Sequence, residues 1–277
     1  METNNEDRIL IANSITKSFG GGSNRMVAVN DVSIELTCGK TIAVVGESGS
    51  GKTTLSKILL GFLKPDSGDI YFENNLCDFS SNKNKKAYWR EVQAIFQDPF
   101  SSFNMFKTVD TFFLECFNPL NQGKLSLKNK VGRITEACSF VGLNYEELIG
   151  RYPFEMSGGQ LQRVMIARIY LIKPKILIAD EPTSMVDACS RANIMEMLLK
   201  LQRETNMAIL LITHDIVLAY NISERINVMQ KGHFVESGKA KEIIFRPKEE
   251  YTKQLINDIP QISNPWSMKR NSNKAIW

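Results

Sequence analysis

The sequence predicts an α/β fold in which helices cover both faces of a mostly parallel sheet. Two observations favour this fold. Short apolar runs of strand length alternate with longer segments in which apolar residues recur at the period of a helix. The runs are apolar at every position, which is typical of parallel strands buried on both faces. The predicted strands are residues 42–45, 92–96, 176–179 and 208–212, and the predicted helices include 53–62, 191–202 and 216–222.

The N-terminal stretch follows a different pattern. Residues 9–15 and 32–36 are typical of strands, and the glycine-rich loop 20–24 lies between them. This arrangement predicts an antiparallel β subdomain at the beginning of the chain.

The residues between about 98 and 173 show mostly helical periodicity, including 127–141 and 157–172, and almost no strand signal. We therefore expect an α-helical subdomain inserted into the sheet domain. The whole domain is expected to span residues 1–258. The polar, asparagine-rich stretch 259–277 is expected to be a loosely ordered tail.

Composition narrows the functional classes. The chain has 277 residues, of which 43% are hydrophobic, enough for a substantial core. Its formal net charge is only +4 and it contains no long lysine or arginine block, so no nucleic-acid partner is expected. The five cysteines are scattered without a C-x-x-C pair, which indicates reduced thiols rather than a disulfide framework or a metal site.

We expect the chain not to enter or cross a membrane by itself. Its opening residues, METNNEDRIL, are acidic and polar, whereas a signal peptide is basic and then apolar. No apolar run approaches the length of about 18 residues that a membrane-spanning helix requires.

A glycine-rich stretch follows the predicted strand 42–45 and precedes the helix 53–62. It fits the P-loop pattern G-x-x-x-x-G-K-[ST] in the strand-loop-helix context that this motif requires. Its backbone N–H groups curl around the α and β phosphates of a nucleotide, Lys52 reaches the β and γ oxygens, and the Thr53 hydroxyl can ligate Mg²⁺. The sequence therefore predicts a P-loop NTPase core whose nucleotide-binding residues are Gly46, Glu47, Ser48, Gly49, Ser50, Gly51, Lys52, Thr53 and Thr54.

Two adjacent carboxylates end the strand 176–179. A nucleotide site needs an acidic group for the metal on a neighbouring strand, and Asp180 is the candidate that holds Mg²⁺, through water. Glu181 could accept a proton from an attacking water or orient it. The alternative, an acidic turn that merely ends a strand, loses weight beside a P-loop.

Three further side chains are candidates for the same site. His214 follows the strand 208–212 and could donate a hydrogen bond to a γ-phosphate oxygen, although a structural histidine is the alternative. Gln97 follows the strand 92–96 and could reach the metal shell, or simply close the strand. Phe19 precedes the glycine-rich loop and could stack on an adenine ring, or pack in the core. His233 lies at an apparent hairpin turn and receives no role.

A second glycine-rich helix start occurs at Ser157-Gly158-Gly159-Gln160. The first backbone N–H groups of a helix are unpaired and carry partial positive charge, and small residues let an anion approach them closely. The sequence therefore predicts a second phosphate-binding helix start, separate from the P-loop.

Several motifs follow one another along the chain in an order that resembles the ATP-binding subunit of an ABC transporter. They are the P-loop, Gln97, residues 156–160, the strand end 176–181, residues 184–187 and His214. The resemblance covers about residues 8–258, and the Ser-Gly-Gly-Gln sequence between a P-loop and an Asp-Glu strand end is highly specific to that family. The family usually has leucine where Met156 and Val186 stand, but both residues remain apolar. The resemblance implies an ATP hydrolase with ATP and Mg²⁺ as cofactors, catalytic residues Lys52, Glu181 and His214, metal-site residues Thr53, Gln97 and Asp180, and Phe19 at the adenine.

The resemblance also implies that two subunits face each other head to tail. Each P-loop site would be closed by the partner's helix start, so that Ser157, Gly158, Gly159 and Gln160 contact ATP bound to the other chain. Asp187 would lie at the seam of the dimer.

Two stretches, residues 97–104 and 251–255 with Ile259-Pro260, look like the oligopeptide, dipeptide and nickel importer subfamily. The chain departs from that pattern at Met105, where proline is usual, and at Glu249-Glu250, where His-Pro is usual. The subfamily implies peripheral attachment to the cytoplasmic face of the membrane. The implied partners are a second ATPase subunit, generally a different chain in this subfamily, two membrane permease subunits and an extracellular solute-binding protein.

Two alternatives compete with an importer subunit that drives uptake of peptides or nickel chelates. One is a soluble ABC-type ATPase that acts on ribosomes or nucleic acid, but such factors generally carry two cassettes or long coiled coils. The other is a regulatory subunit that binds ATP without cleaving it, against which Glu181 and His214 argue.

Overall fold

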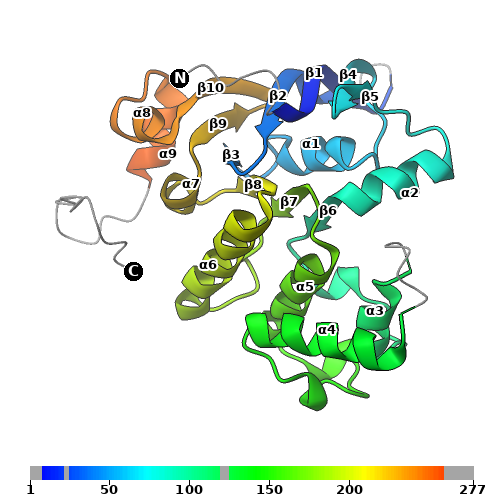
Figure 1. The fold of residues 1–277 in the computed structure, drawn as a ribbon. Coiled ribbons are helices and arrows are strands. Elements are labelled where there is room, and N and C mark those ends of the chain that lie inside the picture. The colour runs from blue at the N-terminus through cyan, green and yellow to red at the C-terminus, as the bar shows by residue number, and fades with distance from the viewer. Residues whose placement is uncertain (1–7, 22–24, 119–124, 259–277) are drawn as a thin grey trace.

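A computed structural model describes residues 8–21, 25–118 and 125–258. Two sheets form the upper part of the molecule in Figure 1, and a group of helices extends below them. The expected tail, residues 259–277, lies outside the described residues, as do residues 22–24 of the glycine-rich loop.

The larger sheet has six strands in the order β10-β9-β3-β8-β7-β6. The neighbours from β9 to β6 are parallel, and β10 pairs antiparallel with β9. The predicted mostly parallel sheet is therefore confirmed. Its strands are β3 (Thr41–Val45), β6 (Val92–Ile95), β7 (Ile176–Asp180), β8 (Ala208–Thr213), β9 (Arg225–Gln230) and β10 (His233–Lys239).

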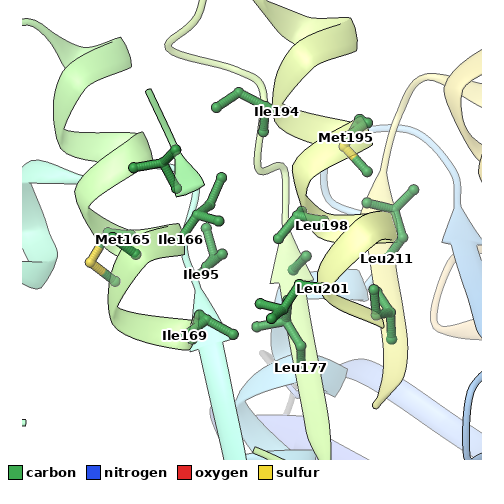
Figure 2. Close-up of a cluster of buried hydrophobic side chains, with 14 of the residues drawn as sticks. Ile95, Met165, Ile166, Ile169, Leu177, Ile194, Met195, Leu198, Leu201 and Leu211 are labelled. Carbon is green, nitrogen blue, oxygen red and sulfur yellow. The ribbon is translucent and has the colours of Figure 1, made fainter. Parts of the chain in front are cut away.

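Both faces of this sheet are buried because each strand contributes alternate residues to two cores. In β7, Leu177 and Ala179 belong to one core, whereas Ile176 and Ile178 belong to the other. On the first face, α5 (Gly158–Ile172) and α6 (Ala188–Thr205) pack over β6, β7 and β8 (Figure 2). The second face packs on α1 (Lys52–Leu59) and on the smaller sheet.

The smaller sheet is antiparallel, in the order β2-β1-β4-β5. Its strands are β1 (Arg8–Phe19), β2 (Met26–Thr37), β4 (Ser67–Phe72) and β5 (Asn75–Leu76). The predicted N-terminal antiparallel subdomain is confirmed, although β1 continues beyond the expected residue 15 and ends at Phe19.

Between β6 and β7 the described residues form helices and loops without a strand (Figure 1). These helices are α3 (Val109–Glu115), α4 (Leu127–Phe140) and α5, with single 3₁₀ turns at Phe100–Ser102, Tyr145–Glu147 and Pro153–Glu155. We keep 98–173 as a proposed boundary for the helical subdomain.

The remaining helices are α2 (Asn82–Glu91), α7 (Ile216–Ile222), α8 (Ala240–Phe245) and α9 (Glu250–Asn257). The sequence did not predict α2, because Tyr88 is its one buried residue and its apolar stripe is correspondingly weak. Among the described residues, none of the helices combines the length and the apolar character needed to cross a bilayer.

Candidate functional site

Three parallel strands carry the candidate residues to one edge of the sheet. Gly46 follows β3, Asp180 ends β7 and His214 follows β8. The expectation that the strand of Asp180 neighbours the P-loop strand is wrong, because β8 lies between β3 and β7. The crossover connections decide strand order, and the residues of a single strand do not encode it. Consequently His214 enters the site between the phosphate loop and the carboxylates.

The phosphate loop, residues 46–53, has a backbone that requires glycine. Gly51 has φ of +111°, and a Cβ built on it would lie 2.2 Å from the carbonyl oxygen of Ala28. The N–H of Ser50 donates to the carbonyl of Glu47 at 3.2 Å, which closes the loop into a tight turn. The loop then leads directly into α1, so the first N–H groups of this helix lie at the site.

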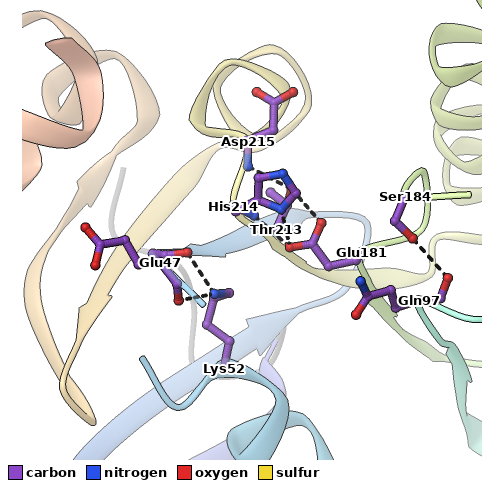
Figure 3. A network of polar contacts seen from close by, with 9 residues as sticks. Glu47, Lys52, Gln97, Glu181, Ser184, Thr213, His214 and Asp215 are labelled. Atoms are coloured by element: carbon purple, nitrogen blue, oxygen red, sulfur yellow. Dashed lines mark hydrogen bonds and ion pairs between the residues drawn. The ribbon is translucent and has the colours of Figure 1, made fainter. Parts of the chain in front are cut away.

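Lys52 is the first residue of α1 and is buried, with only 7% of its surface exposed. Its ammonium donates to the carbonyl oxygens of Gly46 and Glu47, both at 2.7 Å (Figure 3). Burial lowers the pKa of Lys52, and the carboxylates of Glu181, Asp180 and Glu47 oppose this shift. An ammonium group has a third N–H donor, which is available for an anion in the cavity.

Asp180 is buried at the end of β7. Its Oδ2 accepts a hydrogen bond from the Ser56 hydroxyl of α1 at 3.3 Å. Burial raises the pKa of this carboxyl, and hydrogen bonds from Ser56 and Thr53 partly oppose the rise. Asp180 and the Thr53 hydroxyl thus lie together, at a cavity that Lys52 also lines.

Glu181 adopts a left-handed backbone with φ of +50°, which is costly for a residue other than glycine. Its N–H donates to Ile212 of β8 at 2.8 Å, so its backbone is fixed. Its Oε1 accepts the backbone N–H of His214 at 2.9 Å and lies 2.7 Å from the His214 Nδ1 (Figure 3). The contacts with β8 and His214 hold the Glu181 carboxylate at the wall of the cavity described below.

A cavity of about 920 Å³ joins these groups. Most of the residues predicted for a nucleotide site line it: Phe19, Gly46, Glu47, Ser48, Gly49, Gly51, Lys52, Thr53, Thr54, Gln97, Asp180, Glu181 and His214. Ser50 does not line the cavity; its hydroxyl is buried and has no hydrogen-bond partner within the part of the chain that the structure describes.

The aromatic candidate, Phe19, and the amide candidate, Gln97, both line the cavity. Phe19 is 40% exposed and lines the cavity instead of packing in the core. The backbone carbonyl of Gln97 accepts a hydrogen bond from the Ser184 hydroxyl at 3.0 Å, which ties the end of β6 to the loop that follows Glu181 (Figure 3).

Sequence reasoning missed several residues that line the cavity. Lys231 and Gly232 belong to the hairpin turn between β9 and β10, where His233 pairs with Gln230. Leu255 comes from α9, and Tyr251 of the same helix bonds to the phosphate loop. In the sequence, α9 was marked only by the pattern at residues 251–255 that resembles the importer subfamily. That pattern gave no information about where the helix packs.

The second glycine-rich helix start is well formed but lies outside this cavity. The Ser157 hydroxyl accepts the N–H of Gln160 at 3.2 Å, and the Gln160 side chain accepts the N–H of Ser157 at 2.9 Å, so the pair forms a capping box. Ser157 is exposed and Gly159 faces open space. Asp187 caps α6 by accepting the N–H of Ser190 at 3.0 Å. Of the described residues that line the cavity, none belongs to 157–160.

The chain matches the family model described as ABC transporter over residues 29–184. The chain belongs to the ABC transporter family. It is 35% identical to the oligopeptide transport ATP-binding protein AppF of Bacillus subtilis, in an alignment covering 98% of this chain and 84% of AppF. It is 36% identical to the dipeptide transport ATP-binding protein DppD of Haemophilus influenzae, over 92% of this chain and 78% of DppD. The predicted resemblance is confirmed.

Solved ABC cassettes have the same fold. CbiO1 of Clostridium perfringens, part of the ABC transporter complex CbiONQ, aligns with a TM-score of 0.73 and 28% identity over 93% of this chain and 98% of its own. The cassette MJ0796, solved as a dimer in a post-hydrolysis state with ADP and Pi, aligns with a TM-score of 0.75 and 28% identity over 84% and 99% of the two chains. The predicted P-loop NTPase fold is confirmed.

Proposed function

We propose that the chain is the ATP-binding and ATP-hydrolysing subunit of an ABC importer that takes up peptides. One observation carries the proposal: a buried lysine, a buried aspartate and a strained glutamate converge on one cavity beside a glycine-built phosphate loop. This is the set of groups that phosphoryl transfer requires, because its catalysis consists of positioning and charge stabilisation.

Each group has a defined task in this proposal. The loop N–H groups and the ammonium of Lys52 hold the triphosphate, and Phe19 stacks on the adenine. Glu181 orients the attacking water and accepts its proton, and His214 holds the Glu181 carboxylate in place. Because His214 is 71% exposed at its side chain, it can also reach a γ-phosphate from the side of β8.

Mg²⁺ fits the donors present. The Thr53 hydroxyl, the Asp180 carboxylate and the Gln97 amide are hard oxygen ligands around one cavity. The described residues contain no cluster of three or more histidine, cysteine or acidic side chains. Phosphate oxygens and water would complete the shell of the ion. Bound Mg²⁺ would neutralise charge on the β and γ phosphates.

The helix start of α5 closes the site of a partner chain in this proposal. Ser157, Gly158, Gly159 and Gln160 would contact the triphosphate held by the other subunit, and Asp187 would lie at the seam. The support is physical: an exposed anion-binding helix start lies away from the chain's own cavity. The dimeric state of the solved cassette MJ0796 agrees with such pairing.

The complete transporter would contain a second ATPase subunit of a different sequence, two membrane permease subunits and an extracellular solute-binding protein, with this chain at the cytoplasmic face. The relatives are named as oligopeptide and dipeptide transport proteins, which favours peptides over nickel chelates as cargo. The same names argue against a soluble factor acting on ribosomes or nucleic acid.

Uptake of a labelled peptide into cells that carry the assembled transporter tests this function. Lys52→Ala should abolish uptake, whereas Lys57→Ala, an exposed lysine on the same helix, should leave it unchanged. Uptake that persists with Lys52→Ala would contradict the assignment, and copurification of the chain with ribosomes instead of membranes would support the alternative.

A further inference from the structure

The C-terminal helix α9 touches the phosphate loop directly. The hydroxyl oxygen of Tyr251 accepts a hydrogen bond from the backbone N–H of Glu47 at 3.0 Å. Tyr251 is buried, with 8% of its surface exposed. Leu255, one turn further along α9, lines the cavity. One face of α9 therefore forms part of the wall of the site.

The sheet holds the beginning of α9 in place. The Glu236 carboxylate of β10 accepts the backbone N–H groups of Lys248 and Glu249, at 2.9 and 3.2 Å. These N–H groups come just before the helix, where a carboxylate also interacts favourably with the helix dipole. Because α9 is anchored at its start, the Tyr251 hydroxyl presents a fixed acceptor to the phosphate loop.

The peptide units of Glu47 are held from two sides. Tyr251 accepts its N–H, and the Lys52 ammonium donates to its carbonyl. Lys52 lines the cavity, where the third N–H donor of its ammonium is available for a triphosphate. The bond to Tyr251 uses the Glu47 N–H itself, so the protein occupies this donor and the other N–H groups of the loop are left for phosphate. It is the contact that keeps the Glu47 turn in its binding conformation while Lys52 engages the anion.

We propose that Tyr251 is a positioning residue for nucleotide binding, whose hydroxyl holds the phosphate loop in the shape that receives the triphosphate. This inference rests on the proposed nucleotide site and adds to it a residue from outside the phosphate loop and the strand ends. By linkage, a nucleotide that binds the ordered loop also stabilises the docking of α9. Nucleotide binding at the site is thereby coupled to the docking of α9.

The test compares Tyr251→Phe with Tyr145→Phe in the full chain. Tyr145 is a matched control, because it is buried to a similar degree but belongs to the helical region and does not line the cavity. Titration with a fluorescent ATP analogue and Mg²⁺ should show about fivefold weaker binding for Tyr251→Phe, the effect of one hydrogen bond, and unchanged binding for Tyr145→Phe. Equal affinity of Tyr251→Phe and wild type would overturn the inference.

Two further readouts separate positioning from a loss of folding. In the assembled transporter, Tyr251→Phe should raise the KM for ATP and leave kcat at saturating ATP unchanged, because Tyr251 touches no reacting atom. Hydrogen exchange in residues 250–257 should slow on addition of the ATP analogue in the wild type and respond less in Tyr251→Phe. A fall in kcat with unchanged KM would contradict the proposal. So would a rate of hydrogen exchange in residues 250–257 that does not change when the ATP analogue is added to the wild type. Failure of the wild type to bind the analogue would instead overturn the proposed function, and this inference with it.

Discussion

The Glu181 carboxylate and His214 form a two-point contact: Oε1 accepts the backbone N–H at 2.9 Å and lies 2.7 Å from the ring Nδ1. Glu181 holds this position from a left-handed backbone with φ of +50°. The glutamate is thus fixed before nucleotide binds, whereas the ring of the exposed His214 remains accessible from the cavity.

We expect Glu181→Gln to retain ATP binding and to slow hydrolysis by about a hundredfold to ten-thousandfold, because an amide cannot accept the proton of the attacking water. Phosphate release by the assembled complex measures the rate, and titration with a fluorescent ATP analogue measures binding. Glu224→Gln, which alters an exposed carboxylate paired with Lys40, serves as the control. Hydrolysis near the wild-type rate would show that Glu181 is not the base.

His214→Ala should lower kcat by about tenfold to a hundredfold and leave nucleotide affinity almost unchanged, because the carboxylate loses its ring contact and its orientation. The backbone N–H of residue 214 still supports Glu181, so the loss should be smaller than for Glu181→Gln. His233→Ala is a matched control, since this second histidine lies in the β9–β10 hairpin and bonds to Asn30. Equal effects of the two variants on kcat would contradict the assignment.

Asp180→Asn should stabilise the nucleotide-free chain at pH 7 while weakening Mg²⁺-dependent hydrolysis. Burial raises the pKa of this carboxyl, so the folded chain binds the proton more readily than the unfolded chain, and the charged form opposes folding. The difference in free energy of unfolding between Asp180→Asn and the wild type should become smaller as the pH falls toward the ordinary aspartate pKa of about 4.

Urea unfolding at pH 7 and pH 4.5 measures this effect. Asp66→Asn should change the free energy of unfolding in the opposite direction. A hydrogen bond from Lys17 lowers the pKa of the exposed Asp66, so replacing this carboxylate should destabilise the fold at pH 7. A lower free energy of unfolding for Asp180→Asn than for wild type at pH 7 would refute the argument.

Gly159→Ala should leave the folded monomer and its own cavity intact yet reduce turnover of the assembled complex by about tenfold or more, because an added methyl keeps the partner's phosphate away from the helix start. A Cβ at Gly159 meets nothing within 4 Å in the monomer. Gly132→Ala, in helix α4 and equally unobstructed, is the matched control. Thermal unfolding and phosphate release measure the two effects, and wild-type turnover for Gly159→Ala would exclude closure in trans.

The sequence predicts the parts of the fold whose residues are uniformly apolar. Strands β3, β7 and β8 are buried on both faces, so nearly every position carries the signal. Helix α2 escaped prediction because Asn82–Glu91 is mostly polar and buries one residue. The order of β3, β8 and β7 could not be read from the chain, since equivalent apolar strands differ only in how their crossovers run.

The functional site likewise contains residues that the sequence predicted and residues that it did not. Local motifs predicted the phosphate loop and the strand-end residues that the fold brings to one edge. Tyr251 could not be predicted as part of the site, because its contact with Glu47 spans 204 positions and depends on how α9 docks on β10. Contacts of this kind follow from tertiary packing and leave no periodic signal in the sequence.

The most direct test of the account is a structure of the assembled transporter carrying Glu181→Gln, trapped with ATP and Mg²⁺. We expect the Ser157 hydroxyl and the Gly159 N–H to lie within hydrogen-bond distance of the γ-phosphate held in the partner ATPase subunit. A trapped complex in which Ser157 and Gly159 face solvent, with ATP bound elsewhere, would contradict it.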